Sequence, residues 1–142
     1  MLKGISNSIS PELLKILMEM GHGDELVIGD GNFPAASMAQ RLVRADGLDV
    51  PVLLEGILRL FPLDQYVEKP AALMQVVPGD TYQPVIWTEY QEIVARYEPG
   101  FKGFDMVERF AFYERAKKAY AILATSEAAL YANIILKKGV VK

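Results

Sequence analysis

Two positions in the sequence combine an ionisable side chain with a flexible turn, and both could transfer a proton. His22 stands between two glycines and is the only histidine in the chain. Histidine is the side-chain type that ordinarily changes charge between about pH 5 and pH 8. Asp30 also stands between two glycines, where a carboxylate could accept a proton or simply form a turn. His22 could likewise be a surface residue that caps a preceding helix, so residue type alone leaves both interpretations open.

Hydrogen-bonding side chains occur in two further segments. Arg109 precedes an aromatic run, and Tyr131 and Asn133 flank Ala132 shortly before an apolar stretch. Each has a structural alternative: Arg109 could form a surface ion pair with Glu108, and the phenol and the amide could satisfy local backbone groups. Taken with the two ionisable residues, these donors and acceptors suit a neutral ligand that carries several hydroxyl groups.

The sequence lacks the residues that several common classes of site require. It contains no cysteine and one histidine, which excludes a disulfide framework, a thiolate metal site and a multi-histidine zinc site within one chain. It has no Gly-x-Ser-x-Gly motif, and a nucleophilic triad would lack a second histidine or a cysteine. The Gly-Asp-Gly-Asn segment at 29–32 lacks the third glycine and the following helix of a dinucleotide fingerprint. We therefore expect neither a metal nor a cofactor.

Charge and hydropathy restrict the partners that the chain can have. The net charge is −3 and the pI is about 5.2, and Lys and Arg form no long run, so we expect no binding to nucleic acid or to an anionic membrane. The mean hydropathy of +0.15 is high for a soluble monomer and indicates surface buried between subunits. The first residues do not resemble a signal peptide, and no apolar run approaches the roughly 20 residues of a membrane span. The expected location is the cytoplasm.

The elements around His22 and Asp30 are predicted by apolar spacing and by turn residues. A serine followed by a proline starts a helix over 10–20, in which apolar residues recur at helical spacing. A short apolar run over 25–28 predicts a buried strand that ends in the turn containing Asp30. His22 is therefore expected before this strand, and Asp30 at its carboxyl end, where open α/β sheets tend to bind ligands.

The spacing of these two residues creates a geometric difficulty. Eight residue steps separate His22 from Asp30. An extended strand rises about 3.3 Å per residue, so the two side chains of one chain could lie well over about 10 Å apart. Either the turns at both ends fold toward one pocket, or a neighbouring subunit completes the site.

Helices and strands alternate along the rest of the chain, and Arg109 falls at the end of a predicted strand. Helices are expected over 53–61, 87–97 and 112–118, with a helical turn over 34–40, and strands over 42–45, 71–77, 105–110, 119–124 and 133–136. This alternation predicts an α/β fold, a three-layer sandwich around a mixed, mostly parallel sheet of about six strands. The chain shows no linker or repeat, so a single domain over 1–142 is expected.

Five segments, in order along the chain, carry a resemblance to a known family. They are Ile9–Lys15, Met20–Glu25, Arg44–Gly47, Arg109–Ala116 and Tyr131–Val140. On these segments the chain resembles the RbsD/FucU family of sugar mutarotases. The segment that starts at Arg109, Arg-Phe-Ala-Phe-Tyr-Glu-Arg-Ala, looks like the fucose branch of that family rather than the ribose branch.

The resemblance implies an RbsD-like fold and an isomerase that interconverts the α and β anomers of L-fucose by acid–base opening and closure of the ring. It implies His22 as the catalytic proton donor and no cofactor. It implies sugar contacts at Asp30, Arg109, Tyr131, Ala132 and Asn133. It also implies a homo-oligomer, a decamer of two pentameric rings with sites near subunit contacts. Two alternatives stay open: a D-ribose pyranase, and a sugar-binding protein without turnover.

Overall fold

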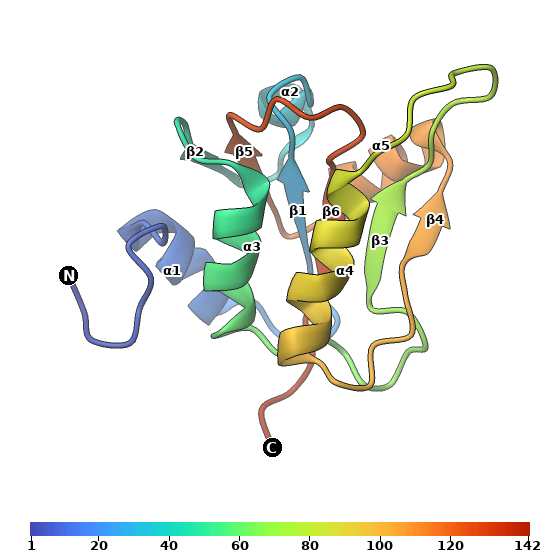
Figure 1. Ribbon diagram of the computed structural model, residues 1–142. Helices are drawn as coiled ribbons and strands as arrows, with labels where there is room; N and C mark the ends of the chain where they lie inside the picture. The colour runs from blue at the N-terminus through green and yellow to red at the C-terminus, as the bar shows by residue number, and fades with distance from the viewer.

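The computed structural model describes residues 1–142, which form one sheet covered by helices on both faces (Figure 1). Six strands lie in the order β2-β5-β1-β6-β3-β4. The elements in chain order are α1 (Pro11–Glu19), β1 (Glu25–Gly29), α2 (Ala35–Met38), β2 (Leu42–Ala45), α3 (Val50–Leu58), β3 (Ala71–Met74), α4 (Ile86–Tyr97), β4 (Asp105–Val107), α5 (Arg109–Lys118), β5 (Ala121–Thr125) and β6 (Ile134–Lys137).

Strand β6 makes the sheet mixed. It pairs antiparallel with β1 and with β3. The other three pairs are parallel: β1 with β5, β2 with β5, and β3 with β4. Ile28 of β1 lies opposite Ile134 at the start of β6, and Glu25 lies opposite Lys137 at its end. The start of β6 is therefore beside the end of β1, and the end of β6 is beside the start of β1.

Two hydrophobic clusters cover the two faces of the sheet. Along β1, Leu26 and Ile28 belong to the larger cluster, which is shared with α1, α3 and α4, whereas Val27 belongs to the smaller cluster with α2 and α5. This division follows from the two-residue period of a strand, which sends successive side chains to opposite faces. The predicted three-layer α/β sandwich with a mixed, mostly parallel sheet is confirmed.

Helix α1 agrees with its predicted range to within one residue at each end. The Ser10 hydroxyl accepts a hydrogen bond from the Leu13 amide at 3.1 Å, and Pro11 occupies the first helical position. Ile16 and Leu17 lie on the buried face. At Met20 the backbone becomes extended, so the turn that contains His22 follows directly.

The predicted strand over 105–110 is wrong in its second half. β4 ends at Val107, and Arg109 is the first residue of α5 rather than the end of a strand. The cause is Glu108, whose carboxylate accepts hydrogen bonds from the amides of Phe110 at 2.9 Å and Ala111 at 3.0 Å. These bonds satisfy two of the amides left free at a helix N-terminus, so the helix begins one turn earlier than the apolar spacing indicates.

Two other elements end three residues earlier than predicted. The predicted strand over 71–77 ends at Met74, because the main chain then leaves the sheet as the loop that leads to α4. The helix expected over 53–61 covers Val50–Leu58, with its proline in the first turn, where a missing amide hydrogen is tolerated.

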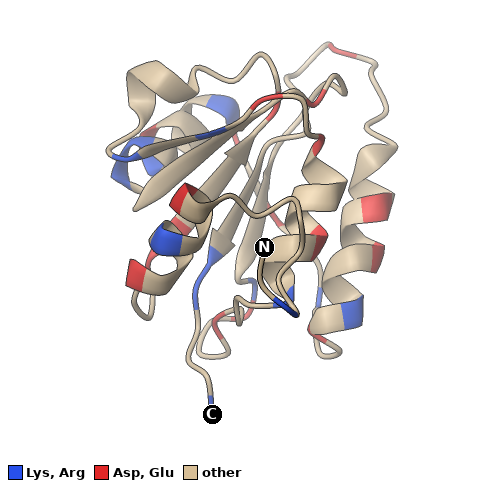
Figure 2. Ribbon diagram, turned by 90° about the vertical axis from the view of Figure 1, so that its left-hand side faces the viewer, with Lys and Arg blue, Asp and Glu red and all other residues tan.

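Charged residues of both signs are distributed over the helices (Figure 2). On α1, Lys15 pairs with Glu19 at 3.1 Å, and α4 has Glu89 in its first turn and Arg96 in its last. The distribution agrees with the absence of a basic run in the sequence. No helix of the structure is both long enough and apolar enough to cross a membrane.

An ion pair between α5 and the sheet joins the helix to β1. The Arg115 guanidinium donates to both carboxylate oxygens of Glu25, with Nε distances of 3.1 and 3.0 Å, and lies 3.5 Å from Asp105 of β4. The Arg115 and Glu25 side chains are only 27% and 19% exposed. Because both groups are largely withdrawn from water, removing one partner leaves the other without adequate solvation.

We therefore predict that Arg115→Met destabilises the protein by about 2 kcal/mol, the usual range for a hydrogen bond to a charged group. Methionine keeps an unbranched apolar stem but leaves the Glu25 carboxylate unpaired. The free energy of unfolding should be measured by urea denaturation at one fixed protein concentration. The matched control is Lys117→Met, which removes an exposed pair with Glu114 at 2.9 Å and should cost less than about 1 kcal/mol. Equal losses in both variants would contradict the argument.

Candidate functional site

A cavity of about 250 Å³ opens at the edge of the sheet where β1 ends. Its lining comes from the turn after β1, the loop after β3, the start of α5 and the segment before β6. The lining residues are Asp30, Asn32, Phe33, Met74, Val77, Asp80, Arg109, Tyr113, Leu130, Tyr131 and Asn133. The structure thus brings together Asp30, Arg109, Tyr131 and Asn133, which the sequence analysis singled out from three separate segments.

Asp30 is the buried acid of this cavity, with 7% of its surface exposed. Its main-chain amide donates to the Asn133 side chain at 2.7 Å, and its carboxylate accepts from the Asn32 amide at 3.0 Å. Burial raises the pKa of Asp30, and the nearby Glu127 carboxylate adds to this, while the hydrogen bonds from main-chain amides oppose it. Asp30 is therefore held in place by a polar frame and binds a proton more readily than an exposed aspartate.

Tyr131, which lines the cavity, is held in an unusual backbone conformation. Its φ angle of 56° lies in the left-handed region, and no other non-glycine residue has a positive φ. The Trp87 indole donates to the Tyr131 carbonyl at 2.8 Å, and the Tyr131 hydroxyl donates to Asp80 at 2.6 Å. The hydrogen bond to Asp80 raises the pKa of Tyr131, so its hydroxyl remains a donor.

Ala132 lies behind the cavity rather than on its lining. It is fully buried, and its carbonyl accepts from the Tyr90 hydroxyl at 2.8 Å. Its main-chain amide interacts with the Asp30 carboxylate. Ala132 thus supports the acid and fixes the segment between Tyr131 and Asn133.

Arg109 reaches the cavity from the first turn of α5. Its guanidinium lies 5.0 Å from the ring centre of Phe110 and 5.7 Å from that of Tyr113, which also lines the cavity. Tyr113 is a residue that the sequence analysis did not identify. Arg109 and Tyr113 are four residues apart, so a helix start at 109 would have placed both on one helix face.

His22 lies at the other end of β1 and does not line this cavity. Its Nε2 atom is 3.0 Å from Oδ1 of Asp64, and its ring centre is 5.3 Å from that of Tyr66. The His22 side chain is 45% exposed, whereas that of Asp64 is 3% exposed. The first alternative from the sequence, that the turns fold His22 and Asp30 toward one pocket, does not hold within one chain.

Asp64 is a second residue that the sequence analysis missed, and its contact with His22 spans 42 positions of sequence. Burial works to raise the pKa of Asp64, but hydrogen bonds from the Tyr66 amide and from His22 outweigh it and keep this pKa below its ordinary value. An ionised carboxylate can only accept hydrogen bonds, so Nε2 of His22 carries the hydrogen. In the neutral ring, Nδ1 is then the atom with a free electron pair.

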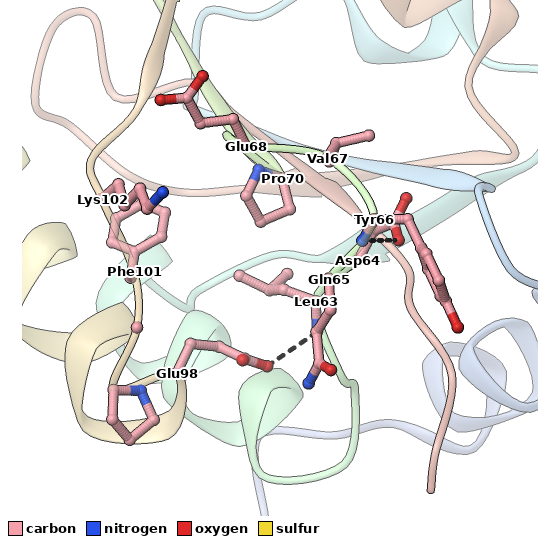
Figure 3. Close-up of a pocket in the computed structure, with 12 residues that line it drawn as sticks. Leu63, Asp64, Gln65, Tyr66, Val67, Glu68, Pro70, Glu98, Phe101 and Lys102 are labelled. Atoms are coloured by element: carbon pink, nitrogen blue, oxygen red, sulfur yellow. Dashed lines mark hydrogen bonds between the residues drawn. The ribbon is translucent and has the colours of Figure 1, made fainter.

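A wide hollow of about 650 Å³ adjoins Asp64 (Figure 3). Its walls are residues 63–68, residue 70 and residues 98–102, and the Glu98 carboxylate accepts from the Leu63 amide at 2.9 Å. This hollow is open and lies beside His22's partner, so the His22 end of the sheet is accessible to another molecule. No three acidic or histidine side chains converge to form a metal site.

Comparisons with known proteins agree across the whole chain. A family model described as the RbsD / FucU transport protein family matches residues 3–141. An L-fucose mutarotase of Actinobacillus pleuropneumoniae serotype 5b is 56% identical over 140 residues, covering 99% of this chain and 97% of that protein. The fucose mutarotase of Homo sapiens is 54% identical over 145 residues, covering 98% of this chain and 94% of that protein.

Solved structures show the same similarity in three dimensions. A fucose mutarotase from Streptococcus pneumoniae in complex with L-fucose has a TM-score of 0.95 at 54% identity and covers 99% of this chain and 100% of its own. Bacillus subtilis RbsD complexed with D-ribose, at 20% identity, has a TM-score of 0.72 over 100% of both chains and shares the fold. On the family match and these full-length relatives, the chain belongs to the RbsD/FucU family.

Proposed function

We propose that this protein is an L-fucose mutarotase, an isomerase that interconverts the α and β anomers of the sugar. The observation that carries the proposal is the cavity that joins Asp30, Arg109, Tyr131 and Asn133. Its volume of about 250 Å³ suits a single monosaccharide. Full-length relatives that are more than half identical are L-fucose mutarotases, which supports the same substrate here.

The reaction needs only proton transfers at two oxygen atoms. One group gives a proton to the ring oxygen while another takes the proton of the anomeric hydroxyl, and the bond between C1 and the ring oxygen breaks. The open-chain aldehyde rotates about its C1–C2 bond, and the reverse transfers close the ring in the other anomeric form. Arg109, Tyr131 and Asn133 supply donors and acceptors that hold the remaining hydroxyl groups, and Asp30 binds the sugar or accepts the anomeric proton.

His22 is the proposed proton donor. Asp64 keeps the hydrogen of the neutral ring on Nε2, and Nδ1 is therefore the atom that exchanges a proton with the sugar. Before the transfer the ring is charged and carries a hydrogen on Nδ1 as well, and the carboxylate stabilises this charged form, as in other aspartate–histidine pairs. With 45% of its side chain exposed, His22 is free to meet a ligand that is bound elsewhere.

Because His22 and Asp30 lie at opposite ends of β1, we propose that subunits share each site. The cavity of one subunit would be completed by His22 of the partner subunit in a homo-oligomer, a decamer of two pentameric rings. Several large apolar side chains are exposed on the single chain and support such contacts; they include Met18, Val52, Tyr66, Val85 and Phe110.

The activity is tested by saturation-transfer NMR on the anomers of L-fucose and on the ring forms of D-ribose. Phe33, Met74 and Val77 give the cavity an apolar side, which can contact the methyl group that L-fucose carries and D-ribose lacks. A contact of this size gives about tenfold or greater discrimination in kcat/KM, so L-fucose should exchange faster. Faster exchange of ribose would favour a pyranase, and saturable binding without exchange would favour a non-catalytic sugar-binding protein.

The role of His22 predicts that His22→Asn lowers anomer exchange by about 10²–10⁴-fold, the usual contribution of a general acid–base group. Asparagine can still hydrogen bond to Asp64, and the cavity that holds the sugar is untouched, so binding of L-fucose should persist. Exchange NMR measures the rate, and circular dichroism and light scattering verify fold and assembly. A folded, assembled variant that turns over at the wild-type rate would remove His22 from the mechanism.

Sharing of sites predicts complementation between two inactive variants. Subunits of His22→Ala retain an intact cavity, and subunits of Asp30→Asn retain an intact histidine. The two variants are mixed in equal amounts, unfolded and refolded together. In a ring with head-to-tail contacts, about a quarter of the sites then combine an intact cavity with an intact histidine. Exchange should therefore recover to about a quarter of the wild-type rate. If each site lay within one chain, the mixture would be as inactive as its components. That result, or a monomer in light scattering, would contradict the sharing of sites between subunits.

A further inference from the structure

The segment that ends β6 lies against the turn that carries His22. The carbonyl of Lys138 accepts from the Gly23 amide at 2.8 Å, and the amide of Lys138 donates to the Asp24 carbonyl at 2.9 Å. These two bonds continue the pairing of β6 with β1 beyond the start of β1. The turn that carries His22 is thereby attached to residue 138.

The same segment is bonded on its other edge to the chain that carries Asp64. The amide of Asp64 donates to the Lys137 carbonyl at 3.0 Å, and the amide of Gly139 donates to the Pro62 carbonyl at 2.7 Å. No backbone hydrogen bond joins residues 21–24 directly to residues 62–64. Residues 137–139 are therefore the backbone link between the two segments whose side chains form the His22–Asp64 pair.

The Lys138 side chain adds a third attachment. Its ammonium group donates to the Leu17 carbonyl at 3.2 Å and to the Met20 carbonyl at the C-terminal end of α1. These carbonyls have no partner within the helix, and a cation is favourable at this end of the helix dipole. One residue thus fixes the end of α1 and the turn that follows it.

Gly139 sets how closely the Asp64 chain can approach. A Cβ atom at this position would lie 2.7 Å from the carbonyl carbon of Leu63 and 2.9 Å from the Cα of Asp64. Both neighbours are main-chain atoms, so a larger residue can be accommodated only if the Asp64 chain moves away. The close approach, rather than any unusual φ angle, requires the glycine.

We propose that Lys138 and Gly139 are positioning residues that set the distance between His22 and Asp64, and hence the proton that His22 presents to the sugar. The inference rests on the proposed function, because it assigns these residues to the acid–base group of that reaction. The two side chains are 3.0 Å apart, and they come from two segments whose backbones are linked by hydrogen bonds only through residues 137–139. A displacement of about 1 Å in a reacting group can cost about 10²-fold in rate.

The first test is Gly139→Ala with Gly100→Ala as the matched control. A Cβ atom on Gly100 would meet no atom within 4 Å, so this variant makes the same chemical change without displacement. The chain has one histidine, so the ¹⁵N signals of its ring are assigned without ambiguity. In the neutral ring of the wild type and of Gly100→Ala, these signals should show hydrogen on Nε2 alone. Gly139→Ala should show both tautomers.

The values of kcat and KM distinguish a positioning role from a general loss of structure. Gly139→Ala should lower kcat for L-fucose exchange by about 10–10²-fold and leave KM unchanged, because the sugar cavity lies at the opposite end of β1. Lys138→Met should act in the same direction, and Lys138→Arg should restore the wild-type signals and kcat, since arginine can donate to both carbonyls. If Gly139→Ala does not fold, the Lys138 pair decides the question.

Wild-type ring signals and wild-type kcat in folded Gly139→Ala, or in Lys138→Met, would overturn the inference. The NMR result does not depend on turnover. If the wild type fails to exchange L-fucose anomers, the proposed function fails, and a change of tautomer confined to Gly139→Ala and Lys138→Met would still support the positioning of His22 by these residues.

Discussion

The antiparallel pairing of β6 with β1 is the constraint on which both halves of the proposed site depend. The side chain of Asn133, just before β6, accepts from the amide of Asp30, just after β1. At the other end, Lys138 pairs with the turn before β1. A shift of one residue in the pairing would turn every side chain of β6 to the opposite face of the sheet. Because both strands are buried, their register is fixed, and this one register sets the positions of both Asp30 and His22.

The two buried carboxylates at opposite ends of this pair have contrasting environments. The Asp30 carboxylate accepts hydrogen bonds only from main-chain amides and has Glu127 nearby, so its burial dominates and its pKa rises. Asp64 is as well buried, but hydrogen bonds from the Tyr66 amide and from His22 outweigh the effect of burial, and its pKa falls. One fold thus provides a carboxyl that binds a proton readily and a carboxylate that stays charged and orients an imidazole.

Local patterns were sufficient to predict most of the fold. The serine cap and apolar spacing located α1, and the apolar run located β1, since these signals act over a few residues. The start of α5 was missed because its cap is Glu108, a residue type that is uncommon at this position. Asp64 could not be found in the same way, because its contact with His22 depends on the position of β6 between two distant segments.

The left-handed conformation of Tyr131 has a consequence for how this protein can change by mutation. A tyrosine in that region is less favourable than a glycine by about 1–2 kcal/mol. The hydrogen bonds from Trp87 and Tyr90 to this segment hold the conformation against that tendency. A glycine at position 131 would relieve the backbone and remove the phenol that borders the cavity. Stability and ligand recognition are therefore opposed at this one residue, and a search for thermostable variants alone would select against the site.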